Sequence, residues 1–156
     1  MIALGDDMDK LSYIYNFLRL SDKLATAGQP LEEELEYVSK AGYEVVINLA
    51  LSDADYSLPD EQRTVTRLGM EYIHLPVIWQ NPTADDLAKF FDVMDKYKNK
   101  KIFVHCAANM RVSSFITLYR VIKEGWEYSD AVNDMHKIWR PDNIWSDFIR
   151  RELSQR

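Results

Sequence analysis

The sequence of 156 residues contains a single cysteine, Cys106, which excludes an intramolecular disulfide framework and is compatible with a reducing compartment. No stretch approaches about 18 consecutive apolar residues, so a membrane-spanning helix is not expected. The first residues include Asp6, Asp7 and Asp9 and lack the basic and then apolar pattern of a signal peptide. These absences favour a cytoplasmic protein.

Positive charge is also scarce, because 19 Lys and Arg face 25 Asp and Glu, for a net charge of −6. Nucleic acids and acidic membranes bind clustered cations, so neither is an expected partner. No group of His, Cys, Asp or Glu has metal-ligand spacing, and we expect neither a metal nor a cofactor. The basic residues near the C-terminus are interpreted as a solvated helix face: Lys137, Arg140, Arg150, Arg151 and Arg156.

The length and a hydrophobic content of 47% suit one core, so we expect a single domain over residues 1–156. Strand-like and helix-like segments alternate, which predicts an α/β fold with a mainly parallel central sheet flanked by helices on both faces. Residues 1–19 form an N-terminal extension or helix in this prediction, and residues 126–156 form a C-terminal helical cover. The expected strands are residues 24–26 at an edge, 45–49, 72–77 and 101–104, and the expected helices are residues 30–42, 59–68, 83–97, 112–123, 128–139 and 144–153.

The strongest functional signal is the turn between the strand at 101–104 and the helix at 112–123, because it holds Cys106 and Arg111. A lone cysteine is usually a small core residue. However, the N-terminus of a helix attracts anions and stabilises a thiolate. Arg111 adds a planar fork of donors for an oxyanion. The pattern therefore predicts a catalytic Cys106 and Arg111 at the carboxyl edge of a parallel sheet.

The run of His105, Cys106, a short loop and Arg111 resembles the signature loop of cysteine-dependent protein tyrosine and dual-specificity phosphatases. Four residues separate Cys106 from Arg111 where that loop usually has five, and Val112 follows where it usually has Ser or Thr. The shorter spacing is similar to the bacterial phosphatase-like domain of β-lactamase-hydrolase-like proteins. Segments 24–30, 45–49 and 69–77 match in the same order, so the resemblance covers residues 20–135.

This resemblance implies a protein tyrosine phosphatase-like fold and the hydrolysis of a phosphate monoester through a phosphocysteine on Cys106. It implies a phosphorylated small molecule or phosphoprotein as the substrate. Asn109 stands where the bacterial branch usually has glycine; Asn tolerates a positive φ, but its side chain is expected close to the ligand's oxygens. The expected phosphate-binding residues are Ala107, Ala108, Asn109, Met110, Arg111 and Val112.

Two neighbours of this loop are expected to support the nucleophile. His105 precedes Cys106 on the strand, so its side chain points away from the loop and is expected to tune the thiolate through a hydrogen bond. Ser113, near the helix start, is expected to donate a hydrogen bond to the thiolate or to help it leave from the intermediate; alternatively, it satisfies the backbone of the helix.

A general acid is not evident, although a positioned proton donor greatly helps a leaving group to depart. The superfamily usually has an aspartate just after the strand that precedes the cysteine strand, but residues 78–82 read Ile-Trp-Gln-Asn-Pro. Asp55 is the best placed of the weak candidates because it lies mid-loop, away from helix starts. The full set is Asp53, Asp55, Asp60, Asp85 and Asp86.

The sequence leaves two alternatives open. A loop with four residues between Cys106 and Arg111 also resembles that of rhodanese-type sulfurtransferases, in which the cysteine carries a persulfide. A shorter loop encloses a smaller guest, which favours sulfur, whereas the order of the upstream segments favours the phosphatases. The second alternative is a non-catalytic module that binds phosphate or another anion without turning it over.

Overall fold

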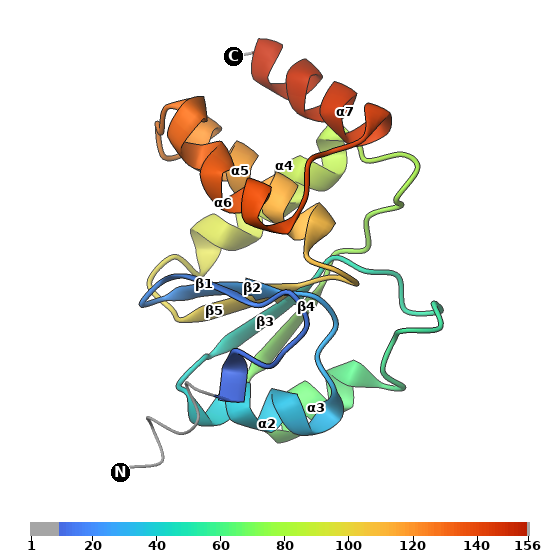
Figure 1. Ribbon diagram of the computed structural model, residues 1–156. Coiled ribbons are helices and arrows are strands. Elements are labelled where there is room, and N and C mark those ends of the chain that lie inside the picture. The colour runs from blue at the N-terminus through green and yellow to red at the C-terminus, as the bar shows by residue number, and fades with distance from the viewer. Residues whose placement is uncertain (1–9, 156) are drawn as a thin grey trace.

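A computed structural model describes residues 10–155, which contain a five-stranded sheet in the order β1-β2-β5-β3-β4 (Figure 1). β2, β5, β3 and β4 run parallel, and β1 pairs antiparallel with β2. The predicted α/β fold with a mainly parallel sheet is therefore confirmed. The strands are β1 (Leu18–Ser21), β2 (Leu24–Ala27), β3 (Val45–Asn48), β4 (Glu71–His74) and β5 (Ile102–His105).

Helices cover both faces of this sheet, as predicted (Figure 1). One face carries α2 (Glu32–Lys40) and α3 (Glu61–Arg67), and the other carries α4 (Ala84–Lys96), α5 (Met110–Ile122), α6 (Tyr128–Ile138) and α7 (Asn143–Ser154). Alternate residues of β5 enter the two cores: Ile102 and Val104 pack with the α4–α7 side, and Phe103 packs with the α2 side. This alternation follows from the two-residue period of a strand.

The placement of β2 corrects the prediction of an edge strand at residues 24–26. β1 pairs with the outer side of β2, so β2 lies inside the sheet, between β1 and β5. β1 has only four residues, of which two are exposed and two half-buried, and so short a segment carries little periodic signal. It begins within the segment predicted as an N-terminal extension or helix, residues 1–19.

The rest of that N-terminal segment is described only in part, because residues 1–9 lie outside the described residues. Lys10 and Leu11 are helical, and turns follow until β1. Leu11 and Ile14 are fully buried and pack in the core on the α2 side. Residues 10–17 therefore pack against the α2 side of the sheet.

Within residues 10–155, no helix is both long and apolar enough to cross a bilayer. The same residues contain no group of three or more His, Cys, Asp and Glu side chains placed to hold a metal ion.

Candidate functional site

β5 and α5 place Cys106 and Arg111 at the carboxyl edge of the sheet. All four residues of β5 are buried, and Cys106 follows directly. Asn109 adopts a left-handed conformation with φ of 64°, after which α5 begins at Met110, two residues earlier than predicted. Arg111 therefore belongs to the first turn of α5. Backbone N–H groups of a first turn have no partner within the helix, so they are free to bind an anion.

A cavity of about 240 Å³ lies beside Cys106. Arg111 lines it and is only 6% exposed; its side chain makes no hydrogen bond or ion pair with any described residue, and its buried Nε has no partner. Its guanidinium carbon lies 5.6 Å from the ring centroid of Trp79. A buried donor such as this Nε–H is unfavourable without a partner, and the guanidinium charge lies at the cavity, so the arrangement favours an anion there. The lining residues are Trp79, Cys106, Ala107, Ala108, Met110 and Arg111.

The loop after Cys106 is held from outside through its carbonyl groups. The carbonyl of Ala107 accepts the Gln29 N–H at 3.0 Å, and that of Ala108 accepts Asn16 Nδ2 at 2.9 Å. A trans peptide points its C=O and its N–H in opposite directions. The N–H groups of Ala108 and Asn109 therefore point away from Gln29 and Asn16. Gly28 allows this close approach, since a Cβ there would lie 2.6 Å from the Ala107 oxygen.

The side chain of Asn109 lies elsewhere than predicted. It is fully buried, and its Nδ2 donates to the Asn16 carbonyl at 2.9 Å and to Thr26 Oγ1 at 3.0 Å. Asn109 is not among the residues that line the cavity. The expectation that this side chain lies close to a ligand's oxygens is therefore wrong, because its amide is used to fasten the loop to β2 and to the N-terminal segment.

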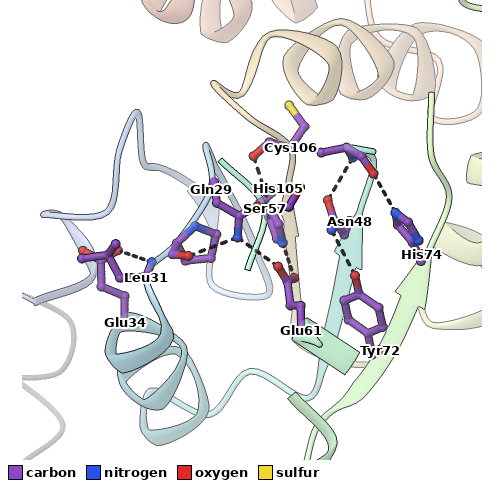
Figure 2. Close-up of polar contacts among 12 residues, drawn as sticks. Gln29, Leu31, Glu34, Asn48, Ser57, Glu61, Tyr72, His74, His105 and Cys106 are labelled. Atoms are coloured by element: carbon purple, nitrogen blue, oxygen red, sulfur yellow. Dashed lines mark hydrogen bonds and ion pairs between the residues drawn. The ribbon is translucent and has the colours of Figure 1, made fainter. Parts of the chain in front are cut away.

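Neither supporting residue is hydrogen-bonded to the thiol in the way the sequence suggested. His105 is fully buried; its Nε2 lies 2.6 Å from Glu61 Oε2 and its Nδ1 lies 3.2 Å from the main-chain oxygen of Cys106 (Figure 2). The Ser113 hydroxyl donates to the Met110 carbonyl at 3.2 Å, which is the backbone alternative. His105 therefore contacts Cys106 at its main-chain oxygen and not at its sulfur.

Glu61 is a residue of this site that sequence analysis missed. It begins α3, is 6% exposed, and accepts Gln29 Nε2 on Oε1 at 2.9 Å while Oε2 faces His105. Burial by itself raises the pKa of Glu61, but the charge and hydrogen bond of His105 and the hydrogen bond from Gln29 hold it below its usual value. A glutamate at a helix start is common, so no local signal distinguished it.

The two aspartates in the first turn of α4 bind groups of their own helix end. Asp86 and Thr83 form a reciprocal pair, with Asp86 N donating to Thr83 Oγ1 at 3.0 Å and Thr83 N donating to Asp86 Oδ2 at 3.1 Å. Asp85 Oδ2 lies 3.1 Å from Lys89 Nζ. Neither lines the cavity beside Cys106.

The other three candidate acids lie between β3 and α3. Asp60 precedes α3 and accepts the Arg63 N–H at 3.4 Å, and it lines a separate polar cavity of about 220 Å³. Asp53 and Asp55 are exposed. None of them lines the cavity beside Cys106, whose described lining contains no carboxylate.

Trp79 is a second residue that sequence analysis did not assign to the site. Its ring lies 5.4 Å from the rings of both Trp139 and Trp145, and its carbonyl accepts Trp145 Nε1 at 3.0 Å. The C-terminal helical region therefore fixes the loop that covers Arg111. Trp79 follows β4 at the carboxyl edge of the sheet, where ligands of α/β proteins bind. This position in the sequence could have indicated that Trp79 lies at the site.

Residues 18–144 match the family model described as a DSP-PTPase phosphatase fused to NAD+ kinase. The chain belongs to this family. The match covers the sheet, the cysteine loop and α6, and it confirms the predicted resemblance to the protein tyrosine and dual-specificity phosphatases.

The curated relatives are β-lactamase hydrolase-like proteins from two strains of Xylella fastidiosa, Temecula1 and 9a5c. Each is 28% identical over 106 residues, which cover 66% of this chain and 24% of the relative. The chain thus spans about a quarter of the length of these relatives. They match the bacterial branch that the short loop indicated.

Solved structures show the same fold. A DUF442 protein from Shewanella putrefaciens CN-32 superposes with a TM-score of 0.85 at 31% identity, covering 95% of this chain and 97% of that one. P. aeruginosa TpbA superposes with a TM-score of 0.71 at 16% identity, covering 88% of this chain and 84% of that one. A cysteine-to-serine variant of TpbA has been solved in complex with phosphotyrosine.

Proposed function

We propose that this protein hydrolyses a phosphate monoester with Cys106 as the nucleophile. The observation that carries the proposal is Arg111, whose buried side chain has no polar partner within residues 10–155 and lines a cavity together with Cys106. An anion in this cavity would supply the missing partner. Membership of the phosphatase family favours phosphoryl transfer over the sulfurtransferase alternative.

In the first step, the Cys106 thiolate attacks phosphorus. A sulfur–phosphorus bond forms as the bond from phosphorus to the ester oxygen breaks, and the leaving oxygen takes the electron pair. Arg111 provides two parallel donors to the phosphoryl oxygens, and the N–H groups of residues 107–112 provide the others. The positive end of α5 favours the negative charge throughout.

In the second step, water attacks the phosphocysteine, the sulfur–phosphorus bond breaks, and Cys106 returns as a thiolate with release of inorganic phosphate. Because no carboxylate of residues 10–155 lines the cavity, we expect the leaving oxygen to take its proton from water. This favours aryl phosphates, whose leaving groups depart without protonation. The apolar side chains of Trp79 and Met110 suit an aromatic substrate, and phosphotyrosine bound to TpbA supports this class.

The substrate is thus a phosphorylated small molecule or phosphoprotein with an aromatic ester. We place the activity in the bacterial cytoplasm, where the single cysteine remains reduced. The curated relatives and the solved structures reported above come from bacteria.

The test is hydrolysis of p-nitrophenyl phosphate by the wild type and by Cys106→Ser. The wild type should release phosphate, and acid quenching during turnover should trap one phosphoryl group on Cys106. Cys106→Ser should lose turnover but keep phosphate binding, because the serine is not ionised and Arg111 is intact. If phosphate stabilised the wild type but no turnover occurred, the protein would be a non-catalytic anion-binding module. A persulfide formed on Cys106 from thiosulfate would indicate a sulfurtransferase.

A further inference from the structure

A buried charge pair lies beneath the cysteine loop, formed by His105 at the end of β5 and Glu61 at the start of α3. His105 is fully buried and Glu61 is 6% exposed, and the atoms Nε2 and Oε2 lie 2.6 Å apart. Figure 2 shows the two side chains pointing toward each other, while the sulfur of Cys106 points the other way. The mechanism above uses neither side chain.

The hydrogen-bond partners of His105 determine its protonation. An ionised carboxylate and a main-chain carbonyl only accept hydrogen bonds. Nε2 faces the Glu61 carboxylate, and Nδ1 lies 3.2 Å from the carbonyl of Cys106. Both nitrogens can be satisfied only if both carry a proton, so the geometry favours an imidazolium ring.

Among residues 10–155, Glu61 is the one charged side chain that pairs with this ring. Its partners across the strands β2 and β3 are Ala27 and Asn48, which are uncharged. On β4, Tyr72 has its pKa raised to about 12, chiefly by burial and then by Glu61, and so stays neutral. The remaining titratable neighbour, His74, pairs with the Ala50 carbonyl at 2.6 Å.

We propose that Glu61 is a positioning residue that keeps His105 charged, and that this charge stabilises the Cys106 thiolate. A buried cation without its partner is strongly unfavourable, so removal of the carboxylate should lead His105 to release a proton. The adjacent thiolate would then lose a neighbouring positive charge. This inference rests on the proposed role of Cys106 as the nucleophile.

The experiment measures the rate of alkylation of Cys106 by iodoacetamide against pH, which does not require phosphatase activity. In Glu61→Gln, the pH of half-maximal rate should rise by about one unit relative to the wild type. His105→Gln should give a similar rise, and the double variant should show no further change, because Glu61 acts through His105. Glu152→Gln, which removes a buried carboxylate in α7, should leave the pH midpoint unchanged.

An unchanged midpoint in Glu61→Gln would overturn the proposal, as would a full additional shift in the double variant. Since loss of Glu61 could prevent folding, a second measurement uses the wild type alone. Nitrogen-15 NMR of the His105 ring at neutral pH should show protons on both ring nitrogens, and a neutral ring would also overturn the proposal. If Glu61→Gln raised the pH midpoint of alkylation as expected but the wild type hydrolysed no aryl phosphate, only the proposed function would be refuted.

Discussion

Replacing Arg111 with methionine should leave the free protein about as stable as the wild type, although Arg111 is only 6% exposed. Its buried Nε–H, which has no partner among the described residues, costs about 1–3 kcal/mol. Its contact with the Trp79 ring at 5.6 Å contributes about 0.5–2 kcal/mol in the opposite direction. Methionine has a similar shape and removes both effects, so the free energy of unfolding should change by less than about 1.5 kcal/mol.

The response to phosphate should differ sharply between the two proteins. At a phosphate concentration about 100 times its dissociation constant, the wild type should gain about 2.7 kcal/mol in unfolding free energy. Arg111→Met should gain little or nothing, because its cavity no longer holds a cation. Urea unfolding with and without phosphate measures both quantities, and potassium chloride at equal ionic strength controls for screening.

Arg120→Met is the matched control, because Arg120 lies in the same helix, is 5% exposed and lies over a tryptophan ring, that of Trp126, at 4.2 Å. Unlike Arg111, it has a partner, Asp134 Oδ2, at 2.7 Å. Arg120→Met should lower the free energy of unfolding by about 1–3 kcal/mol. The stabilisation of this variant by phosphate should equal that of the wild type. A loss above about 3 kcal/mol in Arg111→Met, or a phosphate response equal to that of the wild type, would refute the reasoning.

Three further outcomes are expected. Burial raises the pKa of Asp134, but Arg120 and Lys137 hold this pKa below its usual value. The ion pairs of Asp134 should therefore stabilise the folded protein fully above the ordinary aspartate pKa. This stabilisation should be lost as the pH falls through the lower pKa of the folded state. Thermal melts against pH should show this loss, and Arg120→Met should weaken it. Gly28→Ala places a Cβ 2.6 Å from the Ala107 oxygen, so it should cost about 1–3 kcal/mol in urea unfolding and weaken phosphate binding. Asp55→Asn should slow phenyl phosphate and p-nitrophenyl phosphate hydrolysis to the same small extent; a loss of about a hundredfold on the phenyl ester alone would identify Asp55 as the general acid.

Much of the fold could be predicted because its signals are local. The apolar run of β5 and the helical spacing of α4 and α5 are readable within a short window, and strand–helix alternation then requires a mainly parallel sheet. β1 escaped prediction because only pairing with β2 stabilises so short and half-exposed a strand.

The sequence by itself determined that Cys106 and Arg111 share one turn between a buried strand and a helix, since their spacing along the chain fixes their proximity. It could not determine which distant groups meet that turn. Glu61 lies 44 residues from His105, and Asn109 lies 93 from Asn16. Such contacts depend on how α3 and the N-terminal segment pack on the sheet, so only the tertiary structure decided that Glu61 faces His105 and that the Asn109 side chain is buried away from the cavity.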